Sequence, residues 1–469
     1  MRVYMDENFL LETKTAETLY HDYAAELPII DYHTHFNPAQ IMKNAQFENI
    51  THAWLHGDHY KWRLMRIMGV EERYITGDAT DWEKFQKFAE ILPKCIGNPV
   101  HHWAHMELQR YFDCNLVVNA ENAQEIWDAT EEMLKQDSLR ARPILKKMNV
   151  KMIGTTDDVT SDLQWHKALK EDKTNSVIVT PTFRPDKIVN IEMEGFAKQV
   201  EDLAKQSGKS IDSVDTLKAA LLERIQFFDE MGCKASDHGM EYLVFRKAEA
   251  KTVEEVFQKG LSGVTLSEEE IEIFKTDLML FFGKEFAKRR WVMQLHYCAM
   301  RNINQRMFRL LGPGSGYDTI NPRECARALA EFLSALEEEQ ALPRTIVFSL
   351  NPNDNPIIDS IVGSFQEGGV VGKVQHGMAW WYNDAKVGIE NHLLSFAELG
   401  ALGSFIGMLT DSVSFFSFPR HEYFRRILCN VIGKMVECGE YPNDIKALGE
   451  IVQDISCHNA ARYFGIDLL

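Results

Sequence analysis

The sequence predicts one eight-stranded β/α barrel, and two observations support this fold class. First, the chain has 469 residues and is 45% hydrophobic, which is enough to bury one large core. Second, short apolar runs that end in polar or glycine-containing turns alternate with longer helical patterns, as in the β/α units of a parallel sheet. Since eight such units favour a closed barrel over an open sheet, we expect a single domain over residues 1–469.

The eight predicted strands follow one another along the whole chain. They are LPIIDYH (27–33), VKMIGTT (150–156), SVIVTPT (176–182), GCKASDH (232–238), WVMQLHY (291–297), TIVFSL (345–350), GKVQHG (372–377) and FIGMLTD (405–411). The fourth and seventh runs carry the weakest apolar pattern. No internal repeat and no Pro/Gly/Ser-rich linker divides the chain into independent domains.

Two long intervals between strands predict helical additions to the barrel. The interval of about 36–149 after the first strand is rich in Trp, His and helix-forming residues, so we expect a helical insertion that folds over the barrel mouth. A second helical elaboration is expected over about 239–290. There, Ser267 and Glu270 form a capping-box pattern, and Leu266 with Ile271 forms a hydrophobic staple.

The charge balance argues against a nucleic-acid partner. The chain holds 51 Lys+Arg against 69 Asp+Glu, a formal charge of -18, and it has no basic run that would follow a phosphate backbone. An anionic substrate would therefore depend on a few local Arg or Lys side chains.

The first residues and the cysteines predict a cytoplasmic protein. The N-terminal stretch MRVYMDENFLLETKT has acids where a signal peptide needs a basic start, and no later run reaches the roughly 20 apolar residues of a membrane span. The eight cysteines include no CxxC pair, which is typical of reduced thiols. We expect no membrane partner. Assembly into a homo-oligomer stays open, because core and interface faces look alike in a sequence.

The end of the first predicted strand carries a candidate metal site. His33 and His35 flank Thr34, and alternate residues of a strand point the same way, so two imidazoles can meet one ion. An HxH motif also arises by chance in surface or core histidines. Its position favours the metal interpretation, because catalytic groups in β/α barrels lie at the C-terminal ends of strands.

Two further strand ends carry candidates for the same site. Asp411 ends the eighth strand, which neighbours the first in a closed barrel, so its carboxylate can complete a three-ligand open site. The alternative role for Asp411 is a helix N-cap. His296 ends the fifth strand and is either a further ligand, a substrate contact or a hydrogen-bonded structural histidine.

Ten motifs make the sequence resemble the uronate (glucuronate) isomerases over essentially its whole length. They are IIDYHTH, LHGDHYKWR, NVKMIGTTDD, FRPDK, CKASDH, LGPG, LNPNDN, WWYND, GMLTDS and RHEYFRRILC, in the order that this family shows them. The resemblance implies an amidohydrolase-type barrel that interconverts D-glucuronate with D-fructuronate and D-galacturonate with D-tagaturonate. The substrate would be a small hexuronate.

The resemblance also implies one divalent metal ion, usually zinc, held by His33, His35 and Asp411. Hydrolytic relatives often carry a histidine on the sixth strand, whereas this strand ends at Leu350 and Asn351. We therefore do not expect a two-metal centre.

The family's catalytic roles fall on a few matched residues. Isomerisation needs an opened sugar ring, removal of the proton from carbon 2 and return of a proton to carbon 1. The resemblance implies that His33 helps to hold the ion, that Asp411 handles a hydroxyl proton during ring opening, and that Tyr60 transfers the carbon proton. Since a phenol is a poor base at neutral pH, Tyr60 would need a nearby cation; without the family match it would be taken as a packing residue.

The remaining matches are candidate substrate contacts. Arg184 is similar to an arginine that holds the substrate carboxylate, a group that a planar guanidinium suits. Trp380 and Trp381 offer a wall for the sugar, with Trp380 preferred, and His59 is a further candidate together with His376. The alternatives are an ordinary ion pair for the arginine and core packing for the tryptophans.

One position departs from the family pattern. Members read TDSR at the eighth strand, but this chain has Val413 after Asp411 and Ser412. In the family this arginine is thought to pair with the tyrosine matched by Tyr60, and valine cannot stabilise a phenolate. Three explanations stay open. Another cation such as Arg63 or Arg420 takes the place of the arginine, the enzyme uses a different proton shuttle, or turnover is impaired.

Two other functions compete with the isomerase. One is a metal-dependent hydrolase on the same barrel, in which metal-bound hydroxide attacks an ester, lactone or amide. The other is a sugar-acid-binding protein with a decayed active site, which Val413 suggests. A protein that only binds has little need of the full set of matched residues, so the sequence favours the isomerase.

Overall fold

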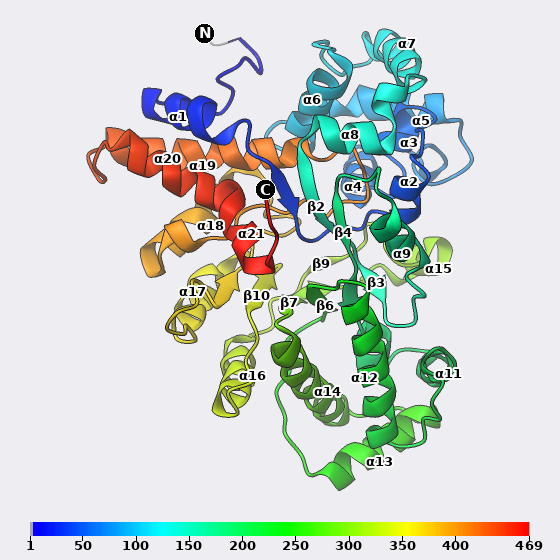
Figure 1. The fold of residues 1–469 in the computed structure, drawn as a ribbon. Coiled ribbons are helices and arrows are strands. Elements are labelled where there is room, and N and C mark those ends of the chain that lie inside the picture. The colour runs from blue at the N-terminus through cyan, green and yellow to red at the C-terminus, as the bar shows by residue number, and fades with distance from the viewer. Residues whose placement is uncertain (1–2, 469) are drawn as a thin grey trace.

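A computed structural model describes residues 3–468 as a barrel of parallel strands that pair largely in chain order (Figure 1). One sheet has the order β1 (Ile29–Asp31), β2 (Val150–Gly154) and β4 (Ile178–Thr180). The other runs from β3 (Asp157–Asp158) through β5 (Thr182–Arg184), β6 (Ala235–Gly239), β7 (Val292–Tyr297) and β10 (Thr345–Ser349) to β11 (Val374–His376). Since β3 continues β2 and β5 continues β4, the two sheets form one wall, and the first seven expected strands are present.

The eighth expected strand, residues 405–411, is not a regular strand in the structure, so that prediction is corrected. The segment still closes the barrel beside β1, because the amide of Asp411 donates to the His33 carbonyl over 3.2 Å and the amide of His35 donates to the Ser412 carbonyl over 3.0 Å. The ladder is interrupted just before these bonds, at Thr410. The amide of Thr410 donates instead to the Asp31 carboxylate, at 2.9 Å, and so cannot pair with a strand carbonyl.

Long helices surround the barrel, and each buries an apolar face against it or against a neighbouring helix. They are α9 (Gln164–Glu171), α12 (Val214–Glu230), α14 (Glu268–Arg289), α16 (Ala326–Glu338), α17 (Asn355–Gly363), α18 (Lys386–Leu399) and α19 (Pro419–Glu437). The predicted capping box of Ser267 and Glu270 is confirmed at the start of α14. Within residues 3–468, none of the helices has the length and apolar character that crossing a membrane requires.

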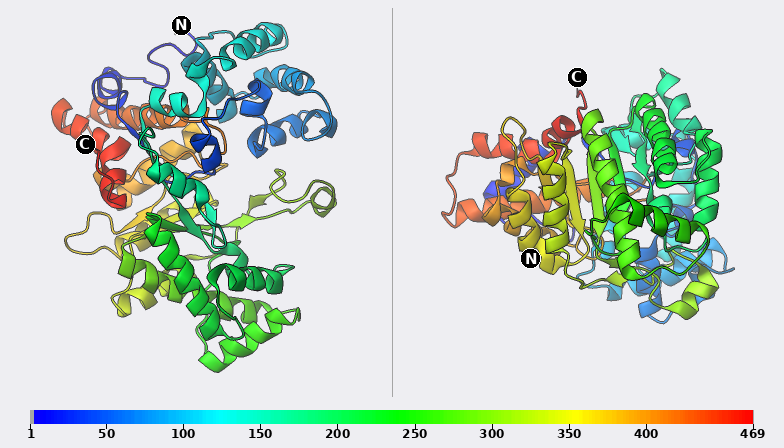
Figure 2. Two further views of the ribbon diagram at one scale, coloured as in Figure 1. Left: turned by 45° about the vertical axis from the view of Figure 1, so that its right-hand side comes forward. Right: turned by 90° about the horizontal axis from the view of Figure 1, so that it is seen from below.

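Helical additions lie at opposite ends of the molecule in Figure 1 and in the left view of Figure 2. The interval between β1 and β2 holds α2 (Pro38–Met42), α3 (Ile50–Trp54), α4 (His59–Ile67), α5 (Asp81–Ile91), α6 (Pro99–Phe112), α7 (Ala123–Leu134) and α8 (Ala141–Lys147), drawn in blue to cyan. At the other end lie α11 (Phe196–Ser207), α12, α13 (Ala250–Leu261) and α14, drawn in green. The boundaries of the insertion and of the single domain stay predictions.

Shorter elements complete the chain. Helices α1 (Lys14–Leu19), α20 (Ile445–Gln453) and α21 (Asn459–Phe464) belong to the two terminal regions, α10 (Asp186–Val189) follows β5, and α15 (Gln305–Leu311) lies between β8 (Ala299–Met300) and β9 (Thr319–Ile320). The antiparallel pair β8 and β9 is absent from the sequence-based expectation, because strands of two residues leave no periodic pattern.

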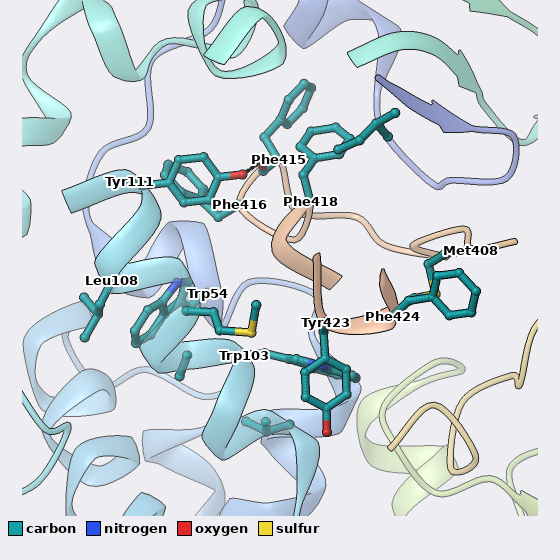
Figure 3. Packing of buried hydrophobic residues seen from close by; sticks show 14 of the residues in the cluster. Trp54, Trp103, Leu108, Tyr111, Met408, Phe415, Phe416, Phe418, Tyr423 and Phe424 are labelled. Atoms are coloured by element: carbon teal, nitrogen blue, oxygen red, sulfur yellow. Dashed lines mark hydrogen bonds between the residues drawn. The ribbon is translucent and has the colours of Figure 1, made fainter. Parts of the chain in front are cut away.

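An aromatic cluster fixes the insertion to the C-terminal part of the barrel (Figure 3). The ring of Trp103 on α6 lies 6.3 Å from that of Tyr423 on α19, and the rings of Tyr111 and Phe112 contact Phe416 at 5.0 and 5.7 Å. Buried aromatic pairs of this kind stabilise a contact by about 0.5–1.5 kcal/mol beyond the area they bury. The insertion therefore packs against α19 and the segment that precedes it.

Candidate active site

A cavity of about 230 Å³ lies where the strand ends meet the beginning of α4. The barrel and the insertion both contribute to its wall. It is lined by nine of the ten residues that the sequence singled out for catalysis, substrate or metal: His33, His35, His59, Tyr60, Arg184, His296, Trp380, Trp381 and Asp411. The structure thus brings together residues that are up to 378 positions apart in the sequence.

Three of these residues form a candidate metal centre. Oδ1 of Asp411 lies 3.2 Å from Nε2 of His33 and 3.1 Å from Nε2 of His35. The other carboxylate oxygen of Asp411 accepts a 2.8 Å hydrogen bond from the Trp380 indole, which fixes its orientation. Three ligand atoms within 4.8 Å of one another, two imidazole and one carboxylate, form a donor set that suits a divalent ion such as zinc.

The electrostatics of Asp411 agree with a ligand role. Burial favours the neutral acid, but the hydrogen bonds and charges of His33 and His35 outweigh it and hold the pKa of Asp411 well below its usual range. The backbone of Asp411 is left-handed, with φ of 46°, which is uncommon for a residue other than glycine. Such conformations persist where the surrounding contacts determine them, and they cluster at functional sites.

A second buried group adjoins the first through His33. Asp237, in the middle of β6, accepts a 2.7 Å hydrogen bond from Nδ1 of His296, and the His296 and His33 rings are 4.7 Å apart. Together, His33, Asp237 and His296 form a second set with metal-ligand spacing. Burial acts against the ionised form of Asp237, but Arg184 and the two histidines lower its pKa well below the usual value.

Arg184 faces the cavity as part of an ion-pair network. Its Nε lies 2.7 Å from Asp186, and its Nη1 lies 3.1 Å from Asp237. A Cβ at Gly239 would stand 2.8 Å from Nη2 of Arg184, so the glycine leaves room for the guanidinium. Arg184 thus forms ion pairs and also lines the cavity, so the two interpretations of this residue are compatible.

Tyr60 begins the opposite wall, on the first turn of α4. Its hydroxyl donates a 2.8 Å hydrogen bond to Oδ2 of Asp384, and its ring lies 5.0 Å from that of His59. Burial and the Asp384 carboxylate raise the pKa of Tyr60 well above its usual value, although Arg420 acts in the opposite direction. The free phenolate that the sequence-based account required is therefore disfavoured.

The two cations proposed to replace the missing arginine are placed differently. Arg63 donates to the Tyr382 hydroxyl and to the Asp318 carbonyl and does not line the cavity. Arg420 lines it, with its guanidinium carbon 5.5 Å from the centre of the Tyr60 ring. Val413 also lines the cavity, with an exposed fraction of 43%, and brings no charge.

Sequence reasoning missed three residues near the site and misplaced one. It did not single out Asp237, although the motif CKASDH contains it, nor Asp384, which lies behind Tyr60. Arg301 lines the cavity and pairs with Asp318 at 2.8 Å, but it directly follows the unpredicted strand β8. His376, a secondary candidate, instead pairs with Asp359 at 2.7 Å outside the cavity wall.

Fold and site together define a barrel enzyme with a metal-type His/Asp centre. The family model of glucuronate isomerase matches residues 1–464. The uronate isomerase of Lachnospira eligens is 51% identical over 468 residues, which cover 100% of both chains, and that of Caldicellulosiruptor bescii is 52% identical over 99% of this chain and 100% of its own.

Solved structures agree. The uronate isomerase of Thermotoga maritima superposes with a TM-score of 0.93 at 34% identity, over 99% of this chain and all of that one. The glucuronate isomerase of Caulobacter crescentus gives 0.92 at 24% identity over 99% and 98%, which supports the fold. The chain belongs to the glucuronate isomerase family and is an isomerase with the (β/α)8 fold of the amidohydrolase type.

Proposed function

We propose that this isomerase interconverts D-glucuronate with D-fructuronate and D-galacturonate with D-tagaturonate. The observation that carries the proposal is the cavity of this family member, in which a metal-type centre and the guanidinium of Arg184 face the same space. A hexuronate presents both a carboxylate and vicinal oxygens, so one molecule can use both ends of the cavity. The acidic chain has no general attraction for such an anion, which makes the local arginine necessary.

We propose that His33, His35 and Asp411 hold one divalent ion, with zinc as the preferred metal. The donor set fits, because the three ligand atoms converge and the Asp411 carboxylate is ionised. When bound, the ion would supply Lewis acidity that polarises a sugar oxygen. The second group, His33, Asp237 and His296, shares a histidine with the first, so it supports orientation of His33 rather than a separate site.

Substrate orientation is assigned to the side chains around the centre. Arg184 binds the carboxylate of the sugar acid, and its pairs with Asp186 and Asp237 fix the guanidinium in place. Trp380 and Trp381 provide an apolar wall against the sugar, with ring centres 5.8 Å apart in an edge-to-face arrangement. His59, whose ring is 5.2 Å from that of Trp381, and His296 make further contacts.

Two side chains move protons in this scheme. Asp411 accepts the hydroxyl proton when the ring opens, since its carboxylate is ionised at neutral pH. Tyr60 transfers the proton between carbon 2 and carbon 1 on one face of an enediol. Both side chains line the same cavity, so a single bound molecule can meet them without leaving.

We further propose the cytoplasm as the compartment. All eight cysteines are free thiols, and seven of them are buried, which suits a reducing environment. Assembly into a homo-oligomer and the absence of nucleic-acid and membrane partners stay predictions.

The test is an assay of the purified, metal-analysed protein with D-glucuronate and D-galacturonate, with products identified by NMR in D₂O. We expect the matching ketoses to form, with deuterium at carbon 1 wherever the transferred proton exchanges with solvent. Cleavage of a lactone or ester without isomerisation would support the hydrolase instead. Binding of the uronates without turnover would support the sugar-acid-binding alternative.

A further inference from the structure

A group of buried charges lies at the Tyr60 wall and is not used by the proposed roles above. Asp58 is the N-cap of α4 and Lys61 belongs to its first turn, whereas Glu107 belongs to α6, Asp384 to the loop before α18, and Arg420 to α19. Each has an exposed fraction of 9% or less. Buried ionisable groups are costly unless they are paired, so their arrangement around one phenol needs a physical reason.

The pairing within this group leaves Arg420 without a dedicated counter-ion. Nζ of Lys61 lies 2.5 Å from Asp58, which neutralises that pair. Nη1 of Arg420 donates to the Thr410 carbonyl over 3.1 Å, but its Nε has no hydrogen-bond partner in the part of the chain that the structure describes. Its guanidinium carbon lies 4.1 Å from the centre of the Trp103 ring and 5.5 Å from that of Tyr60.

Tyr60 therefore stands between the cavity and a hydrogen-bonded acceptor. Tyr60 lines the cavity, while its hydroxyl donates to Oδ2 of Asp384, which does not line it. The other oxygen of Asp384, Oδ1, is buried and has no hydrogen-bond partner among residues 3–468. A proton that leaves Tyr60 toward Asp384 thus leaves on the side away from the substrate.

We propose that Asp384 and Arg420 are positioning residues that make Tyr60 a two-way proton relay in the isomerisation. As the carbon 2–hydrogen bond breaks, its proton passes to the Tyr60 oxygen and the phenolic proton passes to Asp384. The electron pair of that bond becomes the carbon 1–carbon 2 double bond, and the carbonyl electron pair stays on oxygen 1. After the carbon 2 hydroxyl proton moves to oxygen 1, the relay reverses and Tyr60 protonates carbon 1, leaving a carbonyl at carbon 2.

This relay explains how Tyr60 can transfer a proton although its ionised form, the phenolate, is disfavoured. Because the phenol loses one proton as it gains another, no free phenolate has to accumulate. Burial raises the pKa of Asp384 to about 7, against the charge of Arg420, so the carboxylate can both accept and return a proton near neutrality. Arg420 supplies a positive charge at this wall, where Val413 supplies none.

The test rests on the proposed function and compares Asp384→Asn with the matched control Asp359→Asn. Asp359 is equally buried and accepts from His376, but it lies outside the cavity wall. We expect kcat for D-glucuronate to fall by about 10²-fold or more in Asp384→Asn, with KM within about threefold, and to stay native in the control. Equal kcat in both variants, after correction for the folded fraction, overturns the proposal.

A second pair of variants tests Arg420 without removing the acceptor. The groups that face Asp384 are Tyr60, Arg420, Asp411 and Tyr423, so loss of the one cation should move the acidic limb of kcat/KM to higher pH. We expect this shift in Arg420→Gln and its reversal in Arg420→Lys. Coincident pH profiles for the native protein and Arg420→Gln overturn the role of Arg420.

A substrate-free measurement separates failure of the relay from failure of the proposed function. In protein with ¹³Cζ-labelled tyrosine, the Tyr60 signal is assigned by its loss in Tyr60→Phe. We expect it to shift with pH around neutrality in the native protein and not in Asp384→Asn. A native protein without uronate turnover that still shows this titration would contradict only the proposed substrate, whereas a Tyr60 signal that is identical in both overturns the coupling to Asp384.

Discussion

The two walls of the cavity are built in different ways. The centre of His33, His35 and Asp411 comes from neighbouring strand ends and from polar groups that pair directly, at 3.1 and 3.2 Å. The Tyr60 wall combines an insertion helix, a loop and α19, and its cation stands 5.5 Å from the phenol ring, without a paired carboxylate among residues 3–468. In the proposed mechanism, one wall binds an ion through convergent ligands, and the other moves a proton with the help of a buried charge. The comparison yields predictions for each wall.

The largest effect is expected at the ligand wall. The double variant His33→Ala/His35→Ala should lose at least about 10³-fold in kcat/KM. A bound ion stabilises the transition state by several kcal/mol, and without the two imidazoles the ion is not held. Bound divalent metal, measured by elemental analysis, should fall to background. The matched control His21→Ala/His458→Ala changes two histidines outside the cavity wall and should keep both metal and activity. Native activity in the first variant would contradict the metal assignment.

The next effect concerns Arg184. In Arg184→Met, KM for D-glucuronate should rise on the order of 10–100-fold, since a hydrogen bond to a charged group contributes roughly 1.5–3 kcal/mol. Arg246→Met, which breaks surface ion pairs with Glu269 and Glu272, serves as the control and should keep the native KM. Steady-state kinetics decide the point, and an unchanged KM in Arg184→Met would place the carboxylate elsewhere, with Arg301 as the next candidate.

A smaller effect is expected in stability at the Tyr60 wall. Burial raises the pKa of Glu107 to about 7, so the folded state holds a proton that the unfolded chain releases above its ordinary pKa near 4.3. The free energy of unfolding should therefore fall as pH rises from about 4.3 to 7 and then level off. Glu107→Gln should remove this slope and stabilise the fold relative to the native chain at pH 8. Urea titrations at pH 5 and pH 8 measure this, and parallel pH dependence in both proteins would show that Glu107 is ionised in the fold.

These differences explain how far the sequence could predict the molecule. Seven strands, the capping box at Ser267 and the convergence of His33, His35 and Asp411 follow from local patterns and from the cyclic order of a barrel. The strand at 405–411 could not be predicted correctly, because its ladder is broken by a side chain 379 positions away, Asp31. Asp384 gives no local signal of its role, and the sequence could not choose between Arg63 and Arg420, because the Tyr60 wall forms only when α4, the loop before α18 and α19 pack together.

The most direct test of the central claim compares turnover of D-glucuronate by the native protein and by Val413→Arg at equal metal content. If Arg420 already supplies the charge at the Tyr60 wall, the native protein should turn over at an ordinary enzymatic rate, on the order of 1–10³ per second. The added arginine should then change kcat by less than about threefold, an effect well below the rest. An inactive native protein that Val413→Arg restores would contradict the account and identify Val413 as the cause of impaired turnover.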